Sequence, residues 1–157
     1  NDGRSDQQLW NLGRSFFINE RWQPEDSEEG VLIVGYQDSS NFSLIGEICA
    51  LNLQTGKNNW CHVENYISNM AINRQSQLGY IMRDDFVLEI IDLGSGNIQG
   101  EIRFLPSALT EEMLRFSHSY SIALNDSVLI VSFGDSDQTF GLSVNQSSSI
   151  QAPGTTP

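Results

Sequence analysis

Cysteine and histidine are the residue types in this sequence best suited to metal binding or covalent chemistry, and they are few. Cys49 and Cys61 stand twelve residues apart, and His62 and His118 are the only histidines. Two cysteines make neither a disulfide framework nor a zinc site with four ligands. Adjacent residues of a strand point to opposite faces, so one ion would rarely take both Cys61 and His62. We interpret both histidines as ordinary surface or half-buried residues, and we expect no metal site.

Paired acidic residues are the second group that could do chemistry. Asp84-Asp85 and Asp135-Ser-Asp137 resemble fragments of calcium-binding loops, but neither has the full ligand series or the closing Glu of a hand-type site. Acidic residues are common in turns, and we interpret both pairs as turns. The sequence has no glycine-rich phosphate loop, no nucleophile elbow and no spacing that supports a Ser-His-Asp set. We therefore expect no catalytic residues and no cofactor.

The charge balance excludes some partners. The 157 residues include eight Lys and Arg against twenty Asp and Glu, which gives a net charge of −12. Nucleic acid binding needs clustered Lys and Arg to neutralise phosphates, so we expect no nucleic acid partner. No apolar run approaches the roughly 20 residues of a membrane span, so we expect no membrane insertion. The acidity suits a basic protein partner, but we interpret it first as a solvated surface that aids solubility.

The sequence does not indicate a compartment. The chain begins at Asn1 without an initiator Met, so we expect it to be processed or excised from a longer chain, and a targeting signal could have been removed. Asn41, Asn125 and Asn145 begin glycosylation sequons, but about two are expected by chance, so they do not establish secretion.

Short β-rich runs recur along the chain with a long period. The second strand of each unit is expected to begin at Val31, Leu78 and Val128, with spacings of 47 and 50 residues. Periods of about 40 to 50 residues with four short strands are typical of β-propeller blades. The sequence predicts an all-β fold, a partial β-propeller of about three four-stranded antiparallel blades. A propeller needs at least about four blades, so either a longer chain or another chain supplies the rest, or the fold is not a propeller.

The predicted boundaries follow this repeat. Residues 1–8 are expected to be flexible, 9–145 to form the incomplete propeller, and 146–157 to be a disordered tail. Thr110 is a plausible N-cap followed by two acids, which predicts one short inserted helix near 108–116. The expected blades are about 9–63, 66–105 and 117–145, the last without a clear fourth strand. The expected strands lie at 16–18, 31–36, 45–52, 57–63, 68–73, 78–83, 86–92, 97–104, 120–124, 127–133 and 139–144.

One hairpin, from Ala50 to Trp60, indicates how blades could pack. A three-residue loop with Gly56 in the left-handed conformation would place Leu53 opposite Lys57. In that register Ala50 faces Trp60, so a small residue makes room for an indole. Complementary volumes of this kind suit packing between stacked sheets.

The outline of the hairpin recurs from Ile90 to Gly100 with the size order inverted. The same register pairs Glu89 with Glu101, which is unfavourable for two charged groups. Either the register is wrong by one residue or this pair lies at an exposed edge.

The two cysteines would also face each other in the first hairpin. A cross-strand disulfide between Cys49 and Cys61 is conceivable in an oxidising compartment. We favour two buried free thiols.

The first hairpin resembles the repeat of the PQQ-type, or quinoprotein-dehydrogenase-like, β-propellers. In that family an Ala-x-Asp-x-x-Thr-Gly-Lys-x-x-Trp motif ends each blade, and its Trp packs against the neighbouring blade. This sequence has Ala50, Thr55, Gly56, Lys57 and Trp60, with Asn52 in place of the usual Asp. The second copy keeps Asp92, Ser95 and Gly96 but lacks the Ala and the Trp, and the third is barely recognisable. The match covers roughly residues 31–104.

The resemblance implies a fold more than an activity. Quinone-dependent dehydrogenases resemble this chain only in their repeats: they close eight blades and hold a metal and a quinone at the central axis, often under a vicinal disulfide. Here the cysteines are not adjacent, and no Glu-Asn-Asp constellation can be assigned to an axis. This repeat serves enzymes and scaffolds alike, so the resemblance does not decide the function. Because the sequence lacks clustered reactive residues, we expect a protein that is not an enzyme.

We expect a non-catalytic scaffold that binds a protein partner or additional blades, as a piece of a larger propeller or one closed by another chain. Exposed strands at an unclosed end could add a strand from another chain. The alternatives are a sensor or ligand-binding propeller with a pocket near Asp135 or His118, and a fragment of a quinone-dependent dehydrogenase. The candidate contact surfaces are acidic, and for each of them plain solvated surface is the favoured alternative: Glu25, Asp26, Glu28, Glu29, Asp84, Asp85, Glu111 and Glu112.

Overall fold

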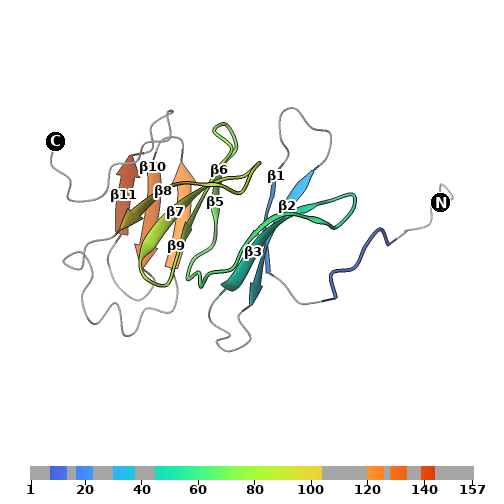
Figure 1. Cartoon of the computed structure of the whole chain (residues 1–157). Coiled ribbons are helices and arrows are strands. Elements are labelled where there is room, and N and C mark those ends of the chain that lie inside the picture. Colours follow the sequence, from blue (N-terminus) through green and yellow to red (C-terminus); the bar gives the residue numbers. More distant parts are fainter. Residues whose placement is uncertain are drawn as a thin grey trace, which may run out of the picture.

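The computed structural model is all-β, with three antiparallel sheets side by side (Figure 1). It describes residues 8–13, 17–22, 30–37, 45–103, 120–125, 128–133 and 139–143. The helix predicted near 108–116 and the tail predicted at 146–157 lie outside these residues. No helix that could span a membrane occurs within these ranges.

In each sheet, strands that follow one another in the chain are neighbours. The first sheet contains β1 (Phe17–Trp22), β2 (Val31–Gln37), β3 (Ile45–Asn52) and β4 (Asn58–His62). The second sheet contains β5 (Ala71–Asn73), β6 (Leu78–Met82), β7 (Val87–Asp92) and β8 (Ile98–Arg103). The third sheet contains β9 (Tyr120–Asn125), β10 (Val128–Phe133) and β11 (Thr139–Ser143). The predicted starts of the second strands, at Val31, Leu78 and Val128, are confirmed.

Stacking of the sheets explains why two strands are apolar along their whole length. Residues 31–36 of β2 and 78–82 of β6 are all buried. A strand that is covered on both faces carries apolar side chains toward both. The two sides of β6 belong to different cores, because Ile81 packs with the first sheet and Tyr80 with the third.

Two cores join the three sheets. Between the first and second sheets, Ile33, Ala50 and Trp60 pack with Ile81 and Ile91. Between the second and third sheets, the core consists of Tyr80, Met82, Leu88, Ile90, Leu129, Val131 and Leu142 with their neighbours. Both faces of β3 and β7, the first strands of the two predicted hairpins, are buried over most of their length.

The two ends of the stack differ. On the outer face of the first sheet, Val34, Cys49 and Leu51 are buried and pack with Trp10 and Leu12. On the third sheet, Leu129 and Val131 face the second sheet and are buried, whereas Val128 and Ile130 are exposed. One end of the stack is therefore capped by the segment around Trp10, and the other presents an open apolar face.

Candidate functional site

The indole of Trp60 joins the first sheet to the second. It lies over Gly96, where an added Cβ would come within 3.0 Å of the ring, and its Nε1 donates a hydrogen bond to the carbonyl of Leu93 at 2.8 Å. His62, two residues further along the same face of β4, has its Nε2 2.5 Å from the carbonyl oxygen of Gly96. The turn between β7 and β8 thus receives two ring side chains from the neighbouring sheet.

Trp10 makes the same contacts with the first sheet. Its ring lies over Gly56, and its Nε1 donates to the carbonyl of Leu53 at 2.8 Å. Sequence reasoning missed this role, because residues 8–13 are not a strand and carry no copy of the hairpin motif. The only signal in the sequence was an isolated Trp between Leu9 and Asn11, and such a pattern is too common to be specific.

The motif residues shape the turns on which these indoles lie. In the first turn, Asn52 Oδ1 accepts hydrogen bonds from the backbone N–H groups of Gln54 and Thr55, at 2.9 and 3.0 Å. Thr55 Oγ1 accepts one from Lys57 N. Gly56 has φ of 70°, a conformation that favours glycine because it has no Cβ.

The second turn repeats this pattern. Asp92 Oδ1 accepts from the N–H of Ser95 at 2.8 Å and from its hydroxyl at 3.0 Å. Gly96 has φ of 78°. A short side chain that caps the turn at its first position, followed by a left-handed glycine, is therefore a structural device that both copies share.

The predicted register of the two hairpins is confirmed at its centre and wrong at the loop. Ala50 lies opposite Trp60, and Ile90 opposite Gly100. The loop is not the three-residue loop we predicted, because the backbone N–H of Asn52 donates to the carbonyl of Lys57. A bulge places Leu51 opposite Asn58, so Leu53 does not face Lys57. The extra residue shifts the turn by one while leaving the small-large pair in place.

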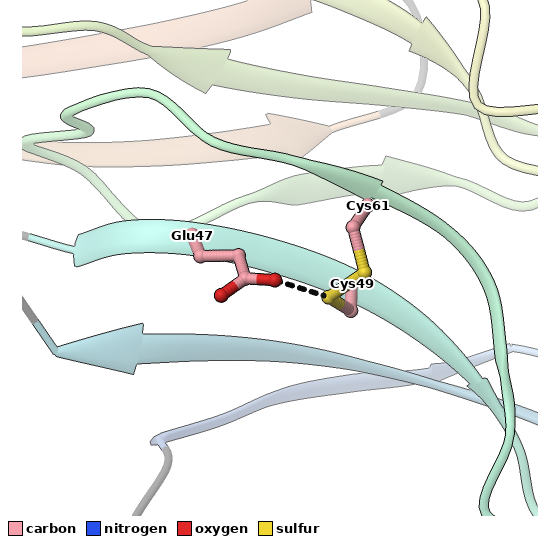
Figure 2. Close-up of side chains that lie close together, drawn as sticks. All are labelled: Glu47, Cys49 and Cys61. Carbon is pink, nitrogen blue, oxygen red and sulfur yellow. Dashed lines mark hydrogen bonds between the residues drawn. A yellow bond between two sulfur atoms is a disulfide. The ribbon is translucent and has the colours of Figure 1, made fainter.

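A disulfide joins Cys49 to Cys61 across β3 and β4 (Figure 2). The prediction of two buried free thiols is therefore wrong; direct opposition brings the two Cα atoms to 4.2 Å, within reach of a bond. Cys49 is buried and Cys61 is exposed. Glu47 lies on the same face, and its Oε1 is 3.4 Å from Cys49 Sγ. A disulfide sulfur has no hydrogen to donate, so this contact becomes a hydrogen bond only in the reduced thiol.

Glu47, Cys49 and Cys61 form the one potential metal-ligating group found among the described residues, with ligand atoms within 4.8 Å of one another. Sequence reasoning missed Glu47, although its spacing of two from Cys49 places both on one face of the strand. A cysteine ligates a metal as the thiolate. While the disulfide persists, this group offers a metal no thiolate.

The predicted pair of opposed carboxylates is real. Glu89 lies opposite Glu101 in the second sheet, and Glu89 is 1% exposed. Arg83 resolves the conflict: its Nη1 is 3.2 Å from Glu89 and 3.5 Å from Glu101. Tyr66 donates a second hydrogen bond to Glu89, at 3.1 Å. The register is therefore correct at this pair, and the explanation by an exposed edge is wrong for Glu89, which is buried. The Arg83 guanidinium, directly after β6, makes the pairing tolerable.

Of the predicted acidic contact surfaces, the described residues include only the turn of Asp84 and Asp85, and both are exposed. Asp85 forms an ion pair with Arg83, which lowers the pKa of its carboxyl. Asp84 has no ion pair with the described residues. The remaining surface residues lie outside the described ranges, as do Asp135, Asp137 and His118: Glu25, Asp26, Glu28, Glu29, Glu111 and Glu112.

No protein-family model matches the sequence, and no curated protein matches it. Solved structures are similar. BamB from Moraxella catarrhalis has 13% identity and a TM-score of 0.50, over 83% of this chain and 36% of that one. AztD from Citrobacter koseri has 13% identity and a TM-score of 0.51, over 81% and 32%. The WD40 domain of Toxoplasma gondii coronin has 14% identity and a TM-score of 0.50, over 75% and 28%.

These neighbours are β-propeller proteins. The three sheets are blades of a β-propeller. At this level of identity the likeness establishes the fold and not an activity. The chain spans about a third of the length of the structures that it matches. We refer to the first, second and third sheets below as blades 1, 2 and 3.

Proposed function

We propose that this chain is a non-catalytic scaffold that binds protein, built from blades of the PQQ-like type. Further blades, from a longer chain or from another chain, complete its propeller. The observation that carries the proposal is that the reactive side chains of the described residues bond to one another. The two sulfur atoms are bonded to each other, and Arg83 is bonded to three carboxylates. These groups hold strands together.

The docking of indoles supports the PQQ-like type. Trp60 packs on the turn glycine of the next blade, as the resemblance implied, and Trp10 repeats the contact. Each Trp holds the turn on which it lies through one hydrogen bond to a backbone carbonyl and through contact of its ring with the turn glycine. Blades fixed in this way form a stiff support for the loops between them, which is what a binding platform needs.

The acidity of the chain favours a partner with basic groups. The net charge is −12, and the Asp84 carboxylate projects from a turn whose other acid is held by Arg83. A fixed acidic turn could meet a Lys or Arg side chain without first becoming ordered, which lowers the entropic cost of binding.

Labelled peptides of graded net charge test this proposal by fluorescence anisotropy. We expect some basic peptides to bind, with differences among sequences of equal charge. Asp84→Asn, or neutralising Glu25, Asp26, Glu28 and Glu29 together, should weaken that binding. Asp126→Asn is the matched control, since it makes the same single charge change as Asp84→Asn outside the predicted surfaces. If affinity follows peptide charge alone and both single variants lose the same amount, the acidic surface is only a solvated one and the proposal is wrong.

A further inference from the structure

Residues 8–12 occupy, beside blade 1, the position that a fourth strand of a preceding blade would occupy. Trp60 belongs to β4, the fourth strand of blade 1, and docks on Gly96 and Leu93 of blade 2. Trp10 docks on Gly56 and Leu53 of blade 1 in the same way. By this correspondence Trp10 comes from the fourth strand of a blade that precedes blade 1. The first three strands of that blade are not among the described residues.

In blade 3 the described residues include the first three strands and no fourth. Its strand order is β11-β10-β9, and within the described residues β11 is paired on one side only. In blades 1 and 2 the corresponding third strands, β3 and β7, are each paired with a fourth. An unpaired edge presents N–H and C=O groups that can bond an added strand.

The registers show which residue would face which. Val31 pairs with Asn52, Leu78 with Asp92 and Val128 with Ser143, so these three pairs are equivalent. Counting back two residues along each third strand, the equivalent residues are Ala50, Ile90 and Gly141.

In two blades this position is one half of a small-large pair. Ala50 faces Trp60, and Ile90 faces Gly100. The residue that corresponds to Trp60 in the segment at 8–12 is Trp10. A fourth strand formed by that segment would therefore place an indole opposite Gly141, which has no side chain to obstruct it.

The outer face of blade 3 exposes apolar side chains at positions that are buried between blades 2 and 3. Val128 and Ile130 are 41% and 36% exposed. The equivalent residues of blade 2, Leu78 and Tyr80, are 4% and 0% exposed, because blade 3 covers them. A further blade on this face would bury Val128 and Ile130 in the same manner.

We propose that residues 8–12 of one copy of this chain add to β11 of a second copy as the fourth strand of its blade 3, antiparallel, with Trp10 opposite Gly141. The segment and β11 lie at opposite ends of the three stacked blades, so these blades do not bring the two together (Figure 1). With three blades in each copy, the contact made twice closes a ring of about six blades, within the usual range of roughly four to eight. This proposal rests on the proposed function, in which further blades come from a longer chain or from another chain. Here the other chain is a second copy of this one.

An engineered disulfide tests the pairing directly. Positions 11 and 140 correspond to the bonded Cys61 and Cys49, one residue beyond Trp10 and one before Gly141. We expect that mixing the Asn11→Cys and Phe140→Cys variants under mild oxidation gives a covalent heterodimer, whose linked peptides are identified by mass spectrometry. Heterodimer formation should exceed the self-linking of either variant alone. Absence of the mixed link, or equal self-linking, overturns the proposal.

Solution mass provides a second test that does not depend on new cysteines. The wild-type chain should sediment at twice its 17.5 kDa mass. Ile130→Asp should sediment as a single chain, because it would bury a carboxylate in the proposed interface, and it should still unfold cooperatively. Val63→Asp, at a side chain that is 77% exposed, is the matched control and should remain a dimer. A monomeric wild type, or a dimer unaffected by Ile130→Asp, overturns the proposal.

These tests are separate from the test of the scaffold function. Binding of basic peptides to the acidic turn involves neither β11 nor Trp10. Ile130→Asp should therefore leave peptide binding unchanged, and loss of peptide binding in Asp84→Asn should leave the mass unchanged.

Discussion

Glu89 shows what single residues in this chain add to the fold. It is buried and opposed to Glu101, a pairing that the sequence register predicted. The sequence could not show how the pairing is tolerated, because Arg83 reaches both carboxylates only once β6 and β7 are adjacent. A buried carboxylate that loses its cation remains desolvated without compensation.

Replacing Arg83 should therefore be costly. Arg83→Met is expected to lower the free energy of unfolding by about 3 kcal/mol, the usual scale for breaking one side of a buried ion pair. Urea unfolding at neutral pH measures it. Arg103→Met, at an exposed arginine of the same blade, is the control and should change little. A loss for Arg83→Met no larger than for the control would show that Glu89 is not held by Arg83.

Ionisation of Tyr66 should lower the stability of the fold at alkaline pH. Burial, together with the nearby Glu89 carboxylate that accepts its hydrogen bond, raises the pKa of Tyr66 far above its ordinary 10.0. A raised pKa in the folded state contributes stability that is present below the unfolded value and is lost as pH rises above it. The free energy of unfolding should thus fall above about pH 10, by up to about 1.4 kcal/mol per pH unit for this group.

Comparison with Tyr66→Phe isolates this contribution. The variant should be less stable than the wild type at pH 8, and its stability should decline less between pH 9 and 11. Urea unfolding across that range gives both slopes. Equal slopes would mean that Tyr66 keeps an ordinary pKa in the folded protein.

The disulfide should stabilise the folded protein by restricting the conformations of the unfolded chain. Its cysteines are 12 residues apart, and closing a loop of this size is worth about 3 kcal/mol in the chain-entropy model. Replacing both cysteines with Ala should lower the free energy of unfolding by about that amount, as should a reducing agent. The reducing agent should have no effect on the double variant. If the oxidised and reduced wild type unfold at the same urea concentration, the bond does not stabilise the fold.

At the scale of elements, the sequence predicted the strands well and their junctions less well. Every predicted strand is present, because apolar runs alternate with turn residues and the blades bury both faces of β2 and β6. The bulge that sets Leu51 opposite Asn58 leaves no mark in the pattern, so the loop was predicted one residue too short. The docking of Trp10 was missed because residues 8–13 are not a strand and carry no copy of the hairpin motif.

Substitution of Gly96, the turn glycine under Trp60, tests how closely β4 docks on the turn between β7 and β8. Gly96→Ala introduces a side chain at a positive φ and pushes a Cβ into the indole. The backbone effect alone costs roughly 1–2 kcal/mol, so we expect a loss of about 2 kcal/mol or more in the free energy of unfolding. Gly94→Ala, at an exposed glycine of the same turn, is the matched control. Equal effects of the two substitutions would argue against close docking of Trp60.

For the whole molecule, the period of the repeat predicted the three blades that the described residues form. It could not predict the completion of the ring that we propose, since that proposal rests on two features distant in sequence. One is Trp10, which stands where a fourth strand should be, and the other is β11, which has a free edge in the described residues. Only the three-dimensional correspondence of Trp10 with Trp60 relates them.

Backbone hydrogen exchange in β11 reports on the added strand itself, because a strand paired at this edge must protect amides that otherwise face solvent. If residues 8–12 of a second copy pair with β11, residues 139–143 should exchange slowly in concentrated wild-type protein, and faster on dilution or in Ile130→Asp. Fast exchange at every concentration, or protection that neither dilution nor Ile130→Asp removes, would contradict this pairing.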